Sequence, residues 1–526
     1  MGPHRPLEMI AILGMFILAL LPIAFLIVAL TALKWEAYAA ALGALAVTAV
    51  EALLIWRMPA WNAVTAAAEG FAMALWPITI VIVAAVWVYN LTVHTGAMEV
   101  IKAQLMGVSS DKRVLTILIG WCFGGFLEGM AGFGSAVAIP ASMLVALGIN
   151  PVTAILSCLL ANGVPTMFGS IGIPTNTLAT ITGLDVVQLS TMQVVQVAPL
   201  VVATPFLMCL VAGGKGALKG MVPLLCVTSL SFLAAEFVCA STIGADLAVI
   251  VGAVCSLVCT VAFALFQKDR PVPERYAIDN LDPDDAVTVD LRSAVVAWSP
   301  FILIFVVLLL TSSLFPFISE PLASIKSTVN IYAGDPNATL TFKWINTPGV
   351  LILLCGVAGG LIQGCGWRDM VSVLGATARQ MSKTVVTMLS VLAVAKLMGY
   401  SGMTSAISAF FVGTLGAFYP AIAPVLGALG TFVTGSGTSS STLFGGVQLE
   451  AATAIGANPY WLVAANSVGV SAGKMLSPQS IAIGSAACDC NGEDSEIFSR
   501  VLPYFIGYVV VMMLVCFFGA PLFPVR

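Results

Sequence analysis

Two ionisable side chains lie inside apolar sequence, each beside a polar or Gly-rich break. Glu128 directly precedes the Gly-rich run Gly129–Gly134, and Lys474 lies in a second broken stretch, Gly473–Ser480. An ionisable group at membrane depth is expensive to bury and marks a functional site by default. A carboxylate at position 128 could take up a proton near neutral pH and release it on the other side of a membrane. Lys474 could attract an anion or neutralise Glu128.

Hydroxyl and amide side chains surround both ionisable groups. A helix that restarts inside a membrane exposes unpaired N–H groups and roughly +0.5 of a charge at its N-terminus, which suits a carboxylate. Neighbouring hydroxyls and amides could bind that carboxylate together with an adjacent hydroxyl group, which favours a small hydroxylated organic anion, although any one of them could simply cap a broken helix. The predicted binding residues are Gly134, Ser135, Asn162, Thr175, Asn176, Ser439, Ser440, Ser441, Asn466, Ser477, Gln479 and Lys474, with Glu128 as the proton-coupling group.

The two polar regions belong to an internal repeat. The first copy carries the Gly-rich run Gly129–Ser135 and an Asn150-Pro151 corner, and the second carries Gly435–Ser441 and an Asn458-Pro459 corner. The corners are offset by 458 − 150 = 308 residues. Non-helical backbone at membrane depth survives only where protein or an aqueous cavity surrounds it. Paired interrupted segments in two halves of a chain therefore point to the binding site of a transporter.

The composition requires a membrane around most of the chain. It is 60% hydrophobic and 9% charged, and we expect an all-α polytopic membrane protein with about 12 transmembrane helices of roughly 20 residues each. Two re-entrant hairpins, at 114–147 and 419–455, add to these spans. The expected spans are 7–31, 36–56, 71–93, 194–213, 219–237, 243–266, 294–314, 347–365, 371–397 and 501–521, with broken helices at 151–182 and 459–486.

The repeat divides the chain into four predicted regions. They are a first repeat at 1–213, two connecting helices at 214–266, a cytoplasmic linker at 267–293 and a second repeat at 294–526. An odd number of expected crossings separates the copies, which inverts one relative to the other. Most Lys and Arg residues then fall in cytoplasmic loops if the N-terminus lies outside. We expect the linker to be a solvated tether and residues 315–346 to form an external cap. We expect the side chain of Lys396 to snorkel from the end of a span.

Other classes of chemistry have little support. The run Gly213–Gly216 lacks the spacing of a phosphate-binding loop, so we expect neither an ATP-driven pump nor an enzyme. Most of the 12 cysteines lie in apolar runs, and the chain has 2 histidines. We therefore expect no metal site, no cofactor and no nucleic-acid partner.

Four motifs in order resemble the L-lactate permease family, and the resemblance covers nearly the whole chain. It implies proton-coupled uptake of L-lactate, with glycolate and D-lactate as common alternatives, across a bacterial inner (plasma) membrane. The family is similar to the ion-transporter superfamily, which implies scaffold and transport domains of the elevator type and a possible homodimer. The motifs are Phe126–Gly134, Leu160–Pro174, Gly435–Ser440 and Ala465–Ser480.

The second tip departs from the family pattern. The family commonly reads Gly-Ser-Asp-Thr-Ser-Ser-Asn there, whereas this chain has Gly437 in place of the Asp and Ser441 in place of the Asn. The missing carboxylate leaves substrate preference and coupling stoichiometry open, and makes Glu128 the clearer proton carrier. Two alternatives remain: a sodium-coupled transporter of another small organic acid, and a membrane subunit of a proton-translocating complex.

Overall fold

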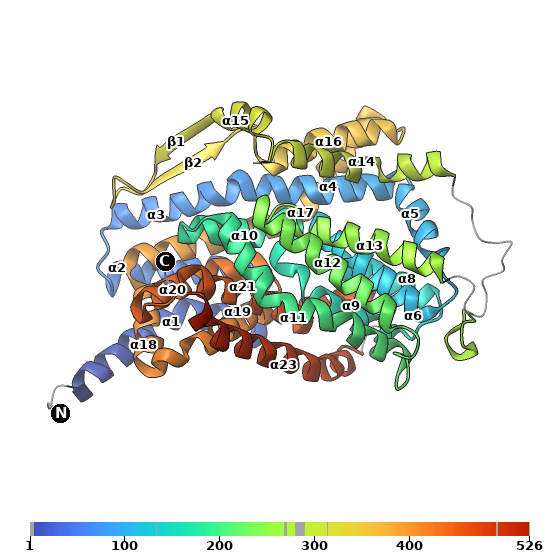
Figure 1. Ribbon diagram of the computed structural model, residues 1–526. Helices are drawn as coiled ribbons and strands as arrows, with labels where there is room; N and C mark the ends of the chain where they lie inside the picture. The colour runs from blue at the N-terminus through green and yellow to red at the C-terminus, as the bar shows by residue number, and fades with distance from the viewer. Residues whose placement is uncertain are drawn as a thin grey trace.

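The computed structural model describes residues 5–132, 134–267, 271–278, 290–312, 314–490 and 493–524. Nearly all of them are helical (Figure 1). The first half contains α1 (Arg5–Thr31), α2 (Ala37–Leu54), α3 (Ala60–Met73), η1 (Ala74–Thr79), α4 (Ile80–His94), α5 (Ala97–Met106), α6 (Lys112–Leu115), η2 (Thr116–Phe123), α7 (Gly124–Met130), α8 (Ser135–Ala146), α9 (Pro151–Asn162), η3 (Pro165–Phe168), α10 (Gly169–Thr182), α11 (Val186–Gly213), α12 (Val222–Thr242) and α13 (Ala248–Phe266). The second half contains η4 (Glu274–Tyr276), α14 (Leu291–Leu310), α15 (Pro316–Ser324), β1 (Lys326–Asn330), β2 (Thr339–Lys343), α16 (Pro348–Ile362), α17 (Trp367–Ser401), α18 (Met403–Leu415), η5 (Gly416–Phe418), α19 (Tyr419–Thr434), α20 (Gly437–Ile455), α21 (Pro459–Leu476), α22 (Pro478–Ala487), α23 (Asp494–Gly519) and η6 (Ala520–Leu522).

The helices are long and apolar enough to make a polytopic membrane protein. Within the described residues, 11 helices could cross a membrane, or up to 12 if the bent pair Pro151–Asn162 and Pro165–Thr182 counts as one span. That pair bends by 58°. The expected span at 347–365 is shorter in the structure, where α16 has 15 residues. Helix α18 continues through η5 into α19, so that residues 403–434 form one apolar stretch of 32 residues.

Two stretches of 35 residues, Ala60–His94 and α17, extend well beyond the lengths expected from the sequence; the first is interrupted by non-helical backbone at Trp76. The sequence predicts a start at 71 for the first, which leaves Glu69 outside the span. Glu69 is instead 5% exposed and forms an ion pair with Lys396 of α17 at 2.7 Å. Tyr400 also donates its hydroxyl to Glu69 at 2.9 Å. The side chain of Lys396, which is 18% exposed, therefore meets the buried carboxylate of Glu69 between the two helices.

Close backbone contact joins α19 to α21. A Cβ atom added at Gly469 would lie 1.8 Å from the carbonyl oxygen of Pro424, and one at Gly473 would lie 2.2 Å from that of Ala428. Small residues let helix backbones approach closely inside a membrane. This approach fixes α21, which carries Lys474, against one arm of the second Gly-rich tip.

Each Asn-Pro corner begins a helix in the same way. Asn150 accepts a hydrogen bond from the backbone of Thr153 at the start of α9, and Asn458 accepts one from Tyr460 at the start of α21. Each corner helix then breaks, α9 before η3 and α10, and α21 at Ser477 before α22. At the first break, Ser170, Ile171 and Gly172 all have positive φ angles of 47°, 58° and 70°. Three consecutive left-handed residues redirect the chain at this point.

The loops add two features to the helical fold. The cap contains an antiparallel pair, β1 and β2, running from Lys326 opposite Lys343 to Asn330 opposite Thr339. The linker is not a free tether throughout: Ala277 pairs with Asp111, and the Arg113 guanidinium stacks 4.0 Å from the Tyr276 ring. Residues 268–270 and 279–289 of the linker lie outside the described part of the chain.

Candidate functional site

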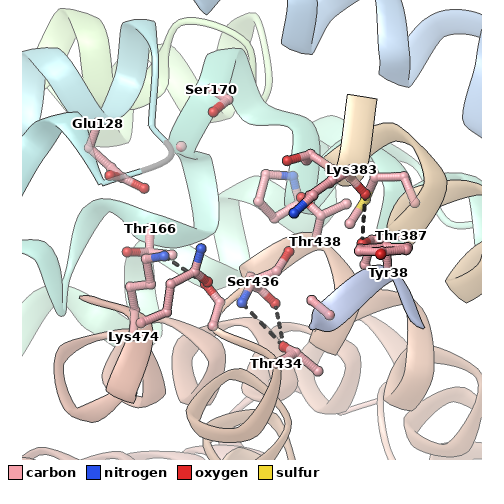
Figure 2. Close-up of a pocket in the computed structure, with 18 of the residues that line it drawn as sticks. Tyr38, Glu128, Thr166, Ser170, Lys383, Thr387, Thr434, Ser436, Thr438 and Lys474 are labelled. Atoms are coloured by element: carbon pink, nitrogen blue, oxygen red, sulfur yellow. Dashed lines mark hydrogen bonds between the residues drawn. The ribbon is translucent and has the colours of Figure 1, made fainter. Parts of the chain in front are cut away.

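A cavity of about 250 Å³ lies where the broken helices and the second Gly-rich tip meet α2 and α17. Figure 2 shows Glu128, Thr166 and Lys474 on one side of it, and Lys383, Thr387 and Tyr38 on the opposite side. The volume suits a ligand smaller than the drug-sized molecules that fill typical pockets of roughly 300–1,000 Å³. The lining residues are Glu36, Ala37, Tyr38, Glu128, Thr166, Gly169, Ser170, Pro174, Lys383, Thr384, Thr387, Met388, Thr434, Gly435, Ser436, Gly437, Thr438, Lys474 and Gln479.

Glu128 on α7 supplies a carboxylate to the cavity wall and is 4% exposed. Its Oε2 accepts a hydrogen bond of 2.8 Å from the side-chain amide of Asn162, the last residue of α9. Its Oε1 lies so close to the start of α10 that a Cβ at Gly169 would stand 2.5 Å away. Glycine at position 169 therefore lets the carboxylate approach the broken segment.

Lys474 on α21 supplies the opposite charge and is 6% exposed. Its Nζ donates a hydrogen bond of 2.6 Å to the carbonyl oxygen of Gly435, the residue that ends α19. The charges of Glu128 and Lys474 attract each other on this side of the cavity. A buried ammonium that makes one hydrogen bond to a carbonyl keeps further N–H donors for an anion.

Hydroxyl groups near the two charges come from the tips and the breaks. Ser436 caps α20 by accepting from the backbone of Ser439 at 3.2 Å, and Thr434 donates to the carbonyl of Ser436 at 3.1 Å. Ser170 donates to the carbonyl of Ala131 at 2.8 Å. These bonds hold the tip and the break in place and set hydroxyl oxygens along the cavity wall.

The opposite wall carries an exposed ion pair. Lys383 of α17 pairs with Glu36, which precedes α2, and their side chains are 64% and 57% exposed. The ammonium of Lys383 also lies 5.5 Å from the ring centre of Tyr38. Both partners line the same cavity, so its more exposed wall also carries one positive and one negative side chain.

Three of the predicted site residues line this cavity: Glu128, Lys474 and Gln479. Asn162 lies behind Glu128 as its hydrogen-bond donor. Gly134 packs on Ile483 instead, so closely that a Cβ added at Gly134 would lie 2.6 Å from that side chain.

The remaining predicted hydroxyl groups are mostly occupied by structural hydrogen bonds. Ser135 donates to the carbonyl of Gly132, Ser440 to that of Gly427, and Ser477 to the hydroxyl of Ser480. Thr175 donates to Met167 and Gln193. These hydroxyl groups therefore cap or pack the helices in this structure and do not face a ligand cavity.

Three further predicted residues are buried with unused polar atoms. Ser439 and Ser441 have hydroxyls, and Asn466 has a side-chain NH₂, without a hydrogen-bond partner among the described residues. All three are 0% exposed and none lines the cavity. They lie behind the tip rather than on its surface.

Asn176 lines a different cavity, of about 600 Å³, beneath β2. Its side-chain amide donates to Asp246 at 2.5 Å. Burial raises the pKa of Asp246 above the ordinary range of an aspartate, and the bond from Asn176 opposes that effect. The structure therefore does not bring Asn176 together with the predicted site residues that line the first cavity.

Sequence reasoning missed most of the hydroxyl lining and the outer ion pair. Ser170, Thr166 and Ser436 lie within the quoted motifs, so a signal for them was present. Glu36 and Lys383 lie in or beside helices that carry no break, and no local pattern marks them.

Comparison with known proteins identifies the family. A family model described as L-lactate permease matches residues 15–523. The chain belongs to the L-lactate permease family. An L-lactate permease of Streptococcus iniae is 42% identical over 85% of this chain and 93% of its own length, and one of Escherichia coli K12 is 33% identical over 92% and 91%. The glycolate permease GlcA of Escherichia coli K12 is 33% identical over 96% of both chains.

Family membership confirms the resemblance carried by the four sequence motifs. It makes the chain a permease rather than an enzyme, with many membrane-spanning helices in the inner membrane. The cavity between the two buried charges is then the candidate place for a transported molecule.

Proposed function

We propose that this protein imports L-lactate together with a proton, and that the molecule binds in the 250 Å³ cavity. The observation that carries the proposal is the placement of Glu128 and Lys474 on one small cavity wall lined with hydroxyls. Lactate carries a carboxylate and a neighbouring hydroxyl, which match an ammonium and Ser or Thr side chains. The relatives named as L-lactate permeases support this choice, and the glycolate permease makes glycolate the leading competitor.

Coupling follows from competition for Lys474. While Glu128 is ionised, its charge neutralises the ammonium and leaves little net attraction for an anion. Once Glu128 takes up a proton, the ammonium is free to pair with the substrate carboxylate. Proton and substrate therefore load together and leave together, and the loaded cavity carries no additional charge.

The energetics favour such a scheme. Moving a monovalent anion inward against an inside-negative potential costs about 2.3 kcal/mol per 100 mV. One accompanying proton cancels that charge, so the potential no longer opposes uptake. A sodium ion would do the same, which is why the driving ion has to be measured.

The proposal includes two inverted repeats, 1–213 and 294–526, and movement of one bundle against a fixed scaffold. The matching Asn caps of α9 and α21 and the break in each corner helix support the repeats. The position of the cavity supports the movement, because one wall comes from α2 and α17 and the other from the broken helices and the tip. Sliding along this boundary would open the cavity to either side in turn.

The test is uptake of labelled L-lactate by proteoliposomes under a pH gradient or a sodium gradient imposed separately. We expect accumulation with the pH gradient alone, and competition by unlabelled glycolate in excess. Accumulation with the sodium gradient alone would overturn proton coupling. Glycolate uptake that exceeds lactate uptake at equal concentration would reassign the substrate while leaving the site in place.

A further inference from the structure

Three side chains with metal-binding atoms meet outside the transport cavity. His94 is the last residue of α4, Cys365 lies between α16 and α17, and Asp369 is in the first turn of α17. One nitrogen, the sulfur and one carboxylate oxygen all lie within 4.8 Å of one another. The residues are up to 369 − 94 = 275 positions apart in the chain, so the sequence alone predicted no metal site.

The surrounding backbone holds these three segments together without help from the three side chains. Thr95 donates its hydroxyl to the side chain of Gln363 at 2.8 Å, and Gln363 donates to the carbonyl of Ala297 at 3.0 Å. The backbone N–H of Cys365 donates to Gly360 at 2.8 Å. The indole of Trp87 on α4 donates to the carbonyl of Met370 at 3.1 Å. The loop and both helix ends are therefore positioned in advance.

We propose that His94, Cys365 and Asp369 bind a divalent transition metal ion, with zinc as the preferred occupant. Zinc accepts thiolate sulfur at about 2.3 Å and imidazole nitrogen or carboxylate oxygen at about 2.0–2.2 Å. Those bond lengths place neighbouring ligand atoms roughly 3.3–3.8 Å apart in a tetrahedron. Closing from 4.8 Å requires shifts of about 1 Å, which the exposed side chains of His94 and Asp369 can make by changing rotamer.

The ligand types decide between metal classes. A thiolate and an imidazole select zinc and other borderline or soft ions, whereas calcium and magnesium prefer oxygen ligands. Cys365 is 9% exposed, and His94 and Asp369 face solvent. Three protein ligands leave the fourth position to water or to a further donor from outside the chain.

Such a site would act on the scaffold rather than on the substrate. Its ligands join the end of α4 to the start of α17, and these two helices already pack against each other. None of the three residues lines the 250 Å³ cavity. We therefore expect metal to affect the stability of this helix pair more than the affinity for substrate.

The test uses full-length protein purified in detergent without a polyhistidine tag. Zinc content is measured by mass spectrometry after dialysis against a weak chelator, and cobalt is then exchanged for zinc. We expect about one zinc per chain and a near-ultraviolet thiolate-to-cobalt absorption band. Cys365→Ser should abolish the band, and His94→Gln and Asp369→Asn should each weaken zinc affinity at least tenfold.

Cys226→Ser is the matched control, because Cys226 is a partly buried free cysteine on α12, away from this site. It should leave both the zinc content and the cobalt band unchanged. The proposal is overturned if wild-type protein retains no zinc, or if Cys365→Ser retains the band. It is also overturned if Cys226→Ser removes the band as completely as Cys365→Ser does. Each variant is compared only after it elutes as a single species, and His94→Gln provides a mild alternative if Cys365→Ser fails to fold.

Discussion

The substitution Glu128→Gln removes the negative charge of the side chain and keeps its size and shape. The variant keeps the length of the side chain and an oxygen that can accept the hydrogen bond from Asn162. It cannot exchange a proton near neutral pH, and it leaves Lys474 without its buried counter-charge. If coupling works as proposed, the variant should lose proton-driven accumulation and retain exchange of internal for external lactate.

The size of the expected change follows from one proton per lactate. A gradient of one pH unit is worth about 1.36 kcal/mol for each proton. With the membrane potential set to zero, wild-type proteoliposomes should accumulate lactate about tenfold, because a factor of ten corresponds to that energy. The variant should stop at a ratio of about one. The substitution leaves the buried Lys474 ammonium without a nearby negative charge, so the thermal unfolding of the variant in detergent has to be measured alongside.

The assay compares gradient-driven accumulation with equimolar exchange in the same liposomes. Glu236→Gln is the matched control, since Glu236 is fully buried on α12 and does not line the cavity. Tenfold accumulation by a folded Glu128→Gln protein would refute the assignment of the proton to this residue. Loss of both accumulation and exchange by a folded protein would instead make Glu128 a structural or binding residue. An equal loss of accumulation in Glu236→Gln would show that the effect is not specific to Glu128.

Three further changes test other parts of the structure. Gly437→Asp restores the carboxylate that the family commonly has at the tip. Its Cβ would lie 3.1 Å from two neighbours, a fit that small shifts permit. The added charge should raise the KM for lactate severalfold near neutral pH by repulsion, whereas Gly437→Asn should leave the KM unchanged. Gly469→Ala should destabilise the protein by at least about 1–3 kcal/mol, because its Cβ would lie 1.8 Å from a backbone oxygen of α19. Gly399→Ala is the control, since nothing lies within 4 Å of its Cβ, and it should unfold like the wild type. Glu69→Gln should lower the free energy of unfolding by about 3 kcal/mol by leaving Lys396 unpaired, and an unchanged unfolding temperature would contradict the role of this ion pair.

The helices could be predicted where hydropathy alone decides them. The sequence predicts a span start at 71 from the apolar run alone, and Glu69 falls outside that run. Only the structure reveals Lys396 opposite Glu69, and the partner lies 396 − 69 = 327 residues away in the chain. The strands β1 and β2 and the docked linker segment depend in the same way on contacts that a single segment does not encode.

The candidate site, too, could be predicted from the sequence only in part. Glu128 and Lys474 could be identified because charge is rare in their surroundings. The serine-rich tip could be identified as a region, but not residue by residue. Because α20 begins at Gly437, Ser436 faces the cavity while Ser439 turns inward. Lys383 and Glu36 come from unbroken segments, and their approach to the site is a property of the assembled fold.

The cap formed by β1 and β2 offers an experimental handle. Ala333 is held by a hydrogen bond to Thr65 on α3, Trp76 donates to Lys343, and Tyr332 stacks on Tyr400 at 3.7 Å. The turn at 334–337 between the strands is exposed. An epitope inserted in that turn would move as a rigid extension of α3 and α17. It could orient particles for imaging, or carry a fluorophore against which a label on α20 tests whether the tip moves relative to the cap.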